Sequence, residues 1–247
     1  MQIDTHCHLS YEDYNNLDEV VNNIDIAITS GTNDKTNKEV LDIVSKYKNI
    51  YGTLGIHPED IDSISDDSFD FIKDNLSNDK IVAIGEIGLD YYWVKDNKEK
   101  QKEILRKQME IAETYNMPVV IHSREAIEET YNILKDYKVK GTIHCFSSSY
   151  EMALNFIKLG YKIGIGGVVT FKNSKKLQEI VEKLDLKDML LETDSPYLSP
   201  EPLRGKKNVP YNTYYVAQKI AEIKNISIDE VFTVTGNNAI ELFDLKI

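Results

Sequence analysis

Residues 2–8 read Gln2-Ile3-Asp4-Thr5-His6-Cys7-His8, a short strand-like run that ends in two histidines. An open, doubly wound sheet usually carries a glycine-rich phosphate-binding loop directly after its first strand. No such loop follows here, so the beginning of the chain favours a closed barrel. The remainder of the chain supports this choice, because short apolar runs and longer amphipathic runs alternate along its length.

The short apolar runs predict β-strands. Several are apolar almost throughout, as expected for strands that are buried on both faces of a parallel sheet. The predicted strands are Gln2–His6, Asp25–Thr29, Ile50–Leu54, Ile81–Glu86, Pro118–His122, Gly141–Cys145, Tyr161–Ile165 and Asp188–Glu192.

Apolar residues recur three and four apart between these runs and after the last one, which indicates amphipathic helices. The predicted helices are Asp34–Lys48, Asn97–Tyr115, Arg124–Tyr137, Tyr150–Leu159, Lys175–Leu184, Tyr211–Lys224 and Ser227–Leu242. Strands that alternate with helices over 247 residues predict a single-domain (β/α)8 TIM barrel spanning residues 1–247. Such barrels build their active sites at the C-terminal rim of the strands.

The composition limits which classes of protein this chain can belong to. No run approaches the ~18 apolar residues of a membrane span, and Met1-Gln2-Ile3-Asp4 does not resemble the start of a secretory signal. We therefore expect a cytoplasmic protein with no membrane contact, no obligate protein partner and a monomeric state. The net charge of −12 argues against a broad basic surface for nucleic acid. It leaves room for an enzyme that engages a few phosphates at bound cations.

The two cysteines, Cys7 and Cys145, do not indicate a disulfide framework. Each lies beside a histidine in a predicted strand, where neighbouring side chains point to opposite faces. We therefore expect both cysteines to point away from those histidines and to be buried packing residues rather than zinc ligands.

All five histidines of the chain fall at or just beyond the C-terminal end of a predicted strand: His6, His8, His57, His122 and His144. Packing alone gives no reason for histidines to gather at the rim where α/β barrels carry their active sites. His6 and His8 are two residues apart, so they share a strand face and both rings can reach one ion.

Two carboxylates also lie at or just beyond the C-terminal end of a predicted strand. Glu86 ends an apolar strand between Gly85 and Gly88, which allow close backbone approach, and a carboxylate there can bridge two cations. Asp194 follows the last strand and is placed to bind a metal and hold the attacking water. We predict catalytic roles for both. One zinc ion usually takes three or four protein ligands. The predicted metal ligands are His6, His8, Glu86, His122, His144 and Asp194. Six protein ligands suit two divalent ions, each of them Zn, Mn, Mg or Fe.

Other groups near the rim are candidates for supporting roles. Glu192 shares the strand face of Asp194 and is either a base that lies behind the metal ligands or a buried, hydrogen-bonded carboxylate. Asp90 either supports a ligand or caps the chain locally. The predicted substrate contacts are His57, Arg124 and Arg204, since a guanidinium offers a fork to phosphate. Three aromatic residues after Glu86 either stack on a base or pack the loop onto the barrel: Tyr91, Tyr92 and Trp93.

Six segments, in order along the chain, resemble the motif series of the TatD-type metal-dependent deoxyribonucleases. They are Ile3-Asp4-Thr5-His6-Cys7-His8, Gly55-Ile56-His57-Pro58, Gly85-Glu86-Ile87-Gly88-Leu89-Asp90-Tyr91, His122-Ser123-Arg124, His144-Cys145-Phe146 and Glu192-Thr193-Asp194-Ser195-Pro196-Tyr197. The resemblance runs from Ile3 to Phe243. It implies a TIM barrel of the metallo-dependent hydrolase superfamily with a divalent-metal centre. The family's ligands fall on the six residues named above, and its substrate-contacting histidine falls on His57.

Two places depart from the family pattern. Many members have a second histidine after the His-Pro pair, where this chain has Glu59, and a carboxylate there repels phosphate. Near the end of the chain, residues 235–239 read Thr-Gly-Asn-Asn-Ala where the family often has Thr-Thr-Glu-Asn-Ala. We expect the second difference to concern helix docking.

The sequence therefore predicts a divalent-metal-dependent deoxyribonuclease, of exonuclease type, whose partner is DNA as a single strand or a 3′ end. In this hypothesis a metal-activated water attacks phosphorus, and the substrate contacts steady the phosphate. Two alternatives stay open. One is hydrolysis of a cyclic amide or an aminoacyl-tRNA ester, because the same barrel serves carbonyl chemistry. Many such relatives are expected to carry a modified lysine where this chain has Glu86. The other alternative is a binding barrel without catalysis.

Overall fold

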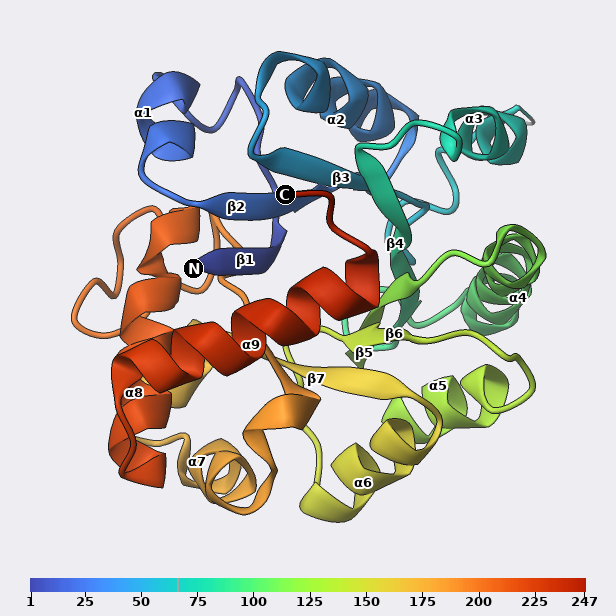
Figure 1. The fold of residues 1–247 in the computed structure, drawn as a ribbon. Coiled ribbons are helices and arrows are strands. Elements are labelled where there is room, and N and C mark those ends of the chain that lie inside the picture. The colour runs from blue at the N-terminus through green and yellow to red at the C-terminus, as the bar shows by residue number, and fades with distance from the viewer. Residues whose placement is uncertain (66) are drawn as a thin grey trace.

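The computed structural model describes residues 1–65 and 67–247. Parallel strands form one eight-stranded sheet in the order β1 to β8, and helices surround it (Figure 1). The prediction of a (β/α)8 barrel is confirmed. The strands are β1 (Ile3–Cys7), β2 (Ile26–Ser30), β3 (Ile50–Leu54), β4 (Ile81–Asp90), β5 (Val119–Arg124), β6 (Gly141–Ile143), β7 (Tyr161–Ile165) and β8 (Met189–Leu191).

The amphipathic runs form helices at the expected places. The helices of the described residues are α1 (Leu17–Asn22), α2 (Asp34–Lys46), α3 (Ser68–Asn75), α4 (Lys98–Tyr115), α5 (Ile127–Leu134), α6 (Tyr150–Lys158), α7 (Lys175–Lys183), α8 (Thr213–Lys224) and α9 (Ile228–Phe243). The sequence reading missed α1 and α3, because each is too short to display an extended apolar period. It also began α5 too early: Arg124 is the last residue of β5.

Strand β4 is longer than predicted and runs four residues past Glu86, so Glu86 lies inside a strand rather than at its end. All ten residues of β4 are buried. Gly88 makes this length possible, because a Cβ at that position would lie 1.9 Å from the carbonyl oxygen of His122. The absence of a side chain lets β4 stay paired with β5 up to the residues of the site.

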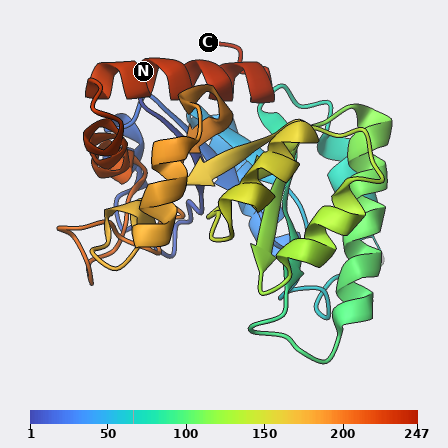
Figure 2. The ribbon, with the colours of Figure 1, turned by 90° about the horizontal axis from the view of Figure 1, so that it is seen from below.

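Helix α9 closes one end of the barrel. It lies across the end where both chain termini are found (Figure 2). Leu242 and Phe243 of this helix belong to the same buried cluster as Ile3, Val82 and Leu190, which come from the strands. The site residues therefore gather at the opposite end, where the strands finish.

A seam of hydrogen bonds joins the first strand to the last. Asp4 accepts hydrogen bonds from both the backbone N–H and the hydroxyl of Thr193, and Thr5 Oγ1 donates to the carbonyl of Leu191. The N–H of Asp194 donates to the carbonyl of His6 over 3.0 Å. Because of this seam, two residues predicted to bind metal lie side by side although they are far apart in the chain.

In residues 1–65 and 67–247, every helix is too short or too polar to serve as a membrane span.

The substitution Gly88→Ala tests the close contact between β4 and β5. We expect it to lower the free energy of unfolding by about 2–4 kcal/mol, from about 1–3 kcal/mol of overpacking and about 1 kcal/mol for a side chain at positive φ. Gly205→Ala is the control, since Gly205 also has positive φ (81°) but an added Cβ there meets no atom within 4 Å. Chemical denaturation measures both. Equal losses for the two variants would contradict the packing argument.

Candidate metal centre

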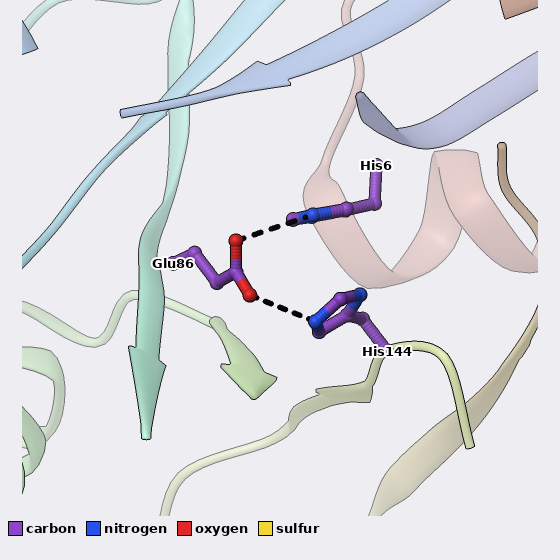
Figure 3. A group of neighbouring side chains, drawn as sticks. All are labelled: His6, Glu86 and His144. Atoms are coloured by element: carbon purple, nitrogen blue, oxygen red, sulfur yellow. Dashed lines mark ion pairs between the residues drawn. The ribbon is translucent and has the colours of Figure 1, made fainter. Parts of the chain in front are cut away.

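Glu86 lies at the centre of the site, and its two carboxylate oxygens face different histidines. Oε1 lies 2.9 Å from His122 Nδ1 and 2.8 Å from His144 Nε2. Oε2 lies 3.4 Å from His6 Nε2 and 3.3 Å from His8 Nε2. Figure 3 shows Glu86 extending from β4 between the rings of His6 and His144, with one oxygen toward each. A carboxylate in this position has the geometry to bridge two cations.

One group of possible ligands consists of His6, His8 and Asp194. The two Nε2 atoms lie 3.2 Å apart, and Asp194 Oδ1 lies 3.5 Å from each of them. Asp194 follows β8 with φ of 56°, a left-handed conformation that aspartate tolerates better than most residues. With Glu86 Oε2, these atoms could hold one divalent cation.

A second group lies on the other side of Glu86. His122 Nδ1 and His144 Nε2 are 3.2 Å apart, and both contact Glu86 Oε1. His57 Nε2 lies 3.4 Å from the same oxygen. All six predicted ligands thus converge, and His57 lies beside them.

In each histidine, the hydrogen bond of the ring nitrogen that faces away from the site determines which nitrogen carries the proton. His57 differs in this respect from His8 and His122. The Nδ1 of His8 faces the carbonyl of Ser30 at 3.1 Å, so in the neutral ring Nδ1 carries the proton and Nε2 has the lone pair. His122 Nε2 faces a carboxylate of Asp90 at 2.9 Å, which in the neutral ring leaves the lone pair on Nδ1. His57 is the reverse case: the N–H of Glu59 donates to its Nδ1, so the proton sits on the Nε2 that faces the site.

The tautomer of His6 follows from a short chain of hydroxyls. Thr53 Oγ1 lies 2.8 Å from the carbonyl of Gly85, which only accepts, so the single Thr53 proton goes there. Ser30 Oγ, 3.0 Å from Thr53 Oγ1, must then donate to Thr53 and accept from His6 Nδ1 at 3.1 Å. In the neutral ring, His6 therefore has its lone pair on Nε2, the nitrogen that faces Glu86. The sequence reading did not identify Ser30 or Thr53, because a hydroxyl within a strand carries no distinctive pattern.

Asp90 performs both roles that the sequence left open. One oxygen accepts from His122, and the other accepts from the N–H groups of Tyr92 and Trp93, each at 2.8 Å. The backbone of Asp90 is held in turn by the side chain of Gln101. This carboxylate thus fixes both the orientation of His122 and the turn that follows β4.

Cys145 and Glu192 lie behind His144. The expectation that Cys145 points away from its neighbouring histidine is wrong: β6 ends at Ile143, and Cys145 has φ of 45°, so strand alternation does not apply. Its sulfur lies near His144 and Glu192. Glu192 is fully buried, accepts from the N–H of Cys145 and lies 3.9 Å from His144 Nδ1. Burial raises the pKa of Glu192 to about 7. Cys7, by contrast, is buried in the main core as expected.

Burial and neighbouring opposite charges shift the pKa values of the cluster in opposite directions. Burial lowers the pKa of His8 and of His122. Hydrogen bonds to Asp194 and Glu86 outweigh burial at His8 and raise its pKa to about 9. Hydrogen bonds to Asp90 and Glu86 do the same at His122, whose pKa is also about 9. Burial would raise the pKa of Glu86, yet the surrounding histidines hold it well below its usual value. In the metal-free protein, protons therefore occupy ring nitrogens that a cation would otherwise take.

The cluster opens into a cavity of about 690 Å³, and His57 and Arg124 both line it. The Arg124 guanidinium lies 4.1 Å from the centre of the Tyr92 ring and 5.3 Å from that of Trp93. Arg204 is placed differently. It is exposed, stacks on Phe171 at 3.9 Å and is not among the described residues that line this cavity.

The aromatic residues after Glu86 divide between the two roles considered. Tyr91 is buried in the core, whereas Tyr92 is 40% exposed and Trp93 is 61% exposed. Only the latter two are therefore accessible to a ligand.

Comparison with known proteins places this cluster in a family. A family model described as TatD related DNase matches residues 3–244. The "uncharacterized metal-dependent hydrolase YabD" of Bacillus subtilis is 38% identical over 255 residues, with 100% of both chains covered. YcfH of Escherichia coli, also named an uncharacterized metal-dependent hydrolase, is 32% identical over 257 residues, covering 98% of this chain and 96% of its own length.

A solved structure agrees with these matches. The crystal structure of YjjV, described as a TatD homolog from Escherichia coli, matches with a TM-score of 0.90 at 31% identity and covers 99% of this chain and 98% of its own. The fold and the matches together define a metal-dependent hydrolase on a TIM barrel. The chain belongs to the TatD family.

The raised pKa values of His8 and His122 predict how metal binding depends on pH. Protons compete with the cation for the same nitrogens, so affinity should be weakest at low pH and should rise until about pH 9, where these groups lose their protons. Each displaced proton contributes about a tenfold change per pH unit. Calorimetric titration of metal-free protein with Mn²⁺ at pH 6.5–9, in two buffers of different ionisation enthalpy, measures affinity and proton release. An affinity that does not change with pH would contradict the assignment.

The substitution Asp90→Asn tests the support of His122. Asparagine can still cap the turn through its carbonyl, but it removes the negative charge that makes His122 a stronger ligand. We expect metal affinity to fall roughly 10–100-fold with little change in melting temperature. Asp62→Asn is the control, since Asp62 is exposed and pairs with Lys100. An unchanged affinity in Asp90→Asn would show that this hydrogen bond does not tune the site.

Proposed function

We propose that this chain is a deoxyribonuclease that hydrolyses phosphodiester bonds with two divalent ions, each of which is Zn, Mn, Mg or Fe. In this proposal the ligands are His6, His8, Glu86, His122, His144 and Asp194. The observation that carries it is the position of Glu86, whose two oxygens serve two separate groups of ring nitrogens. A pair of cations held in this way suits the in-line displacement at a phosphodiester.

The donor set fits divalent cations. The nitrogens of His6 and His8 lie 3.2 Å apart, as do those of His122 and His144, although the hydrogen bonds on the far side give His6, His8 and His122 lone pairs toward the site. Lone pairs at this separation repel unless a proton or a cation lies between them. Bound divalent cations would lower the pKa of water and oppose the negative charge that develops on the phosphate.

The protein groups around the cluster have complementary roles in this proposal. Asp194 is placed to orient a water molecule by accepting a hydrogen bond from it, because its pKa lies well below the usual value and it stays ionised. Burial would raise that pKa, but hydrogen bonds from His6 and His8 lower it. Glu192 supports His144 from behind.

The substrate contacts differ in how directly they can act. His57 has its proton on Nε2, facing the site, so it can donate to a phosphate oxygen. Arg124 lines the cavity and can offer its guanidinium to the same group. Arg204 lies outside the cavity, so we propose it as a contact only for a strand long enough to extend over Phe171.

Asp194→Asn is the decisive variant for this function. We expect wild type to cleave short single-stranded DNA with added Mn²⁺, Zn²⁺ or Mg²⁺, and Asp194→Asn to lose about 100-fold or more of that rate. Asp185→Asn is the control, since Asp185 is 72% exposed and pairs with Lys187. Strands labelled at the 5′ or the 3′ end distinguish stepwise digestion from internal cutting.

Three outcomes would count against this proposal. Faster turnover of cyclic amides or aminoacyl esters than of DNA would favour the carbonyl hydrolase. Tight metal binding without turnover of any substrate would indicate a binding protein. Full activity in Asp194→Asn would remove Asp194 from the mechanism.

A further inference from the structure

Two cavities meet at the metal centre. The larger one, of about 690 Å³, lies on the side of residues 8–60, and the smaller one, of about 260 Å³, lies on the side of residues 144–177. His122, His144 and Asp194 line both cavities, as do Arg124 and Leu198. The cluster is therefore open to a substrate from both cavities.

The two cavities differ in chemistry. The larger one is lined by one lysine, Lys35, which pairs with Glu12, and by an excess of carboxylates: Glu12, Asp13, Glu39, Glu59 and Asp60. The smaller one is lined by the apolar side chains of Phe146, Val168, Leu177 and Leu198, with the hydroxyl of Ser147 beside them. Among the described residues that line the smaller cavity, Arg124 is the one charged side chain outside the metal cluster.

We propose that the smaller cavity is a subsite for one nucleobase, carried by the nucleotide whose phosphate is attacked. This inference rests on the proposed function and adds a part of the substrate to it. An apolar wall with one aromatic ring suits the uncharged face of a base, and a hydroxyl suits the polar edge of the base, since it both donates and accepts.

Size and charge limit the occupant to a single base. Pockets for drug-sized ligands hold about 300–1,000 Å³, so a cavity of about 260 Å³ is too small for a second nucleotide. A second phosphate would also enter a space with apolar walls. The larger cavity is a poorer place for the nucleotide, because its carboxylates oppose a polyanion.

Two substitutions fill the smaller cavity without touching the proposed ligands. Leu177 on α7 and Val168 after β7 are both only partly buried, so Leu177→Trp and Val168→Phe can enlarge the side chain without strain in the core. Leu154→Trp is the matched control, because Leu154 is also a partly buried leucine on a neighbouring helix, α6, and does not line this cavity.

The assay compares two esters with the same leaving group in the presence of Mn²⁺. One is the p-nitrophenyl ester of thymidine 5′-monophosphate, and the other is methyl p-nitrophenyl phosphate, which has no base. We expect both filling variants to lower kcat/KM for the thymidine ester about tenfold and to leave the methyl ester within about twofold of wild type. Leu154→Trp should change neither.

The outcomes separate this inference from the proposed function. Cleavage of neither ester by wild type defeats the proposed phosphodiesterase and this subsite with it. Cleavage of both esters with unchanged rates in the filling variants, or an equal fall for both esters, overturns the subsite alone. A crystal soaked with thymidine 5′-monophosphate gives a second measurement: density for the base against Phe146 supports the subsite, and density in the larger cavity contradicts it.

Discussion

A buried carboxylate requires compensation, and the site is organised around that of Glu86. Only 3% of this residue is exposed. An isolated ionised carboxylate at such a depth would cost several kcal/mol, so the surrounding structure has to provide positive charge. His6 and His122, at the ends of β1 and β5, provide it as protonated rings, or a bound cation provides it. The same contacts that keep Glu86 ionised therefore gather the donor atoms that could hold a metal ion.

The rigidity of this cluster comes from groups one layer further out. Ser30 contacts both His6 and His8, and Thr53 connects Ser30 to the backbone next to Glu86. Asp90 likewise holds the ring of His122 in place through a hydrogen bond. These contacts join neighbouring strands to one another, so a displacement of one strand would disturb ligands on several. The barrel and the metal centre are in this sense one structure.

The sequence predicted the barrel and the convergence of the six candidate ligands because both follow from strand periodicity and from the shared rim of parallel strands. It could not predict features that depend on tertiary contacts. The conformation of Cys145 turns its sulfur back toward the site, and the Arg204 guanidinium stacks on Phe171. The length of β4 was missed because a glycine normally weakens a strand, whereas Gly88 allows close contact with His122.

The seam between β1 and β8 has a consequence for how the protein is made. Asp4 bonds to Thr193, 189 residues later in the chain, and His6 meets Asp194 across the same seam. During synthesis, β1 cannot pair with the residues that follow β8 until those residues have left the ribosome. The predicted ligands of the first strand therefore meet Asp194 only after nearly the whole polypeptide has emerged, so the cluster is incomplete for most of translation.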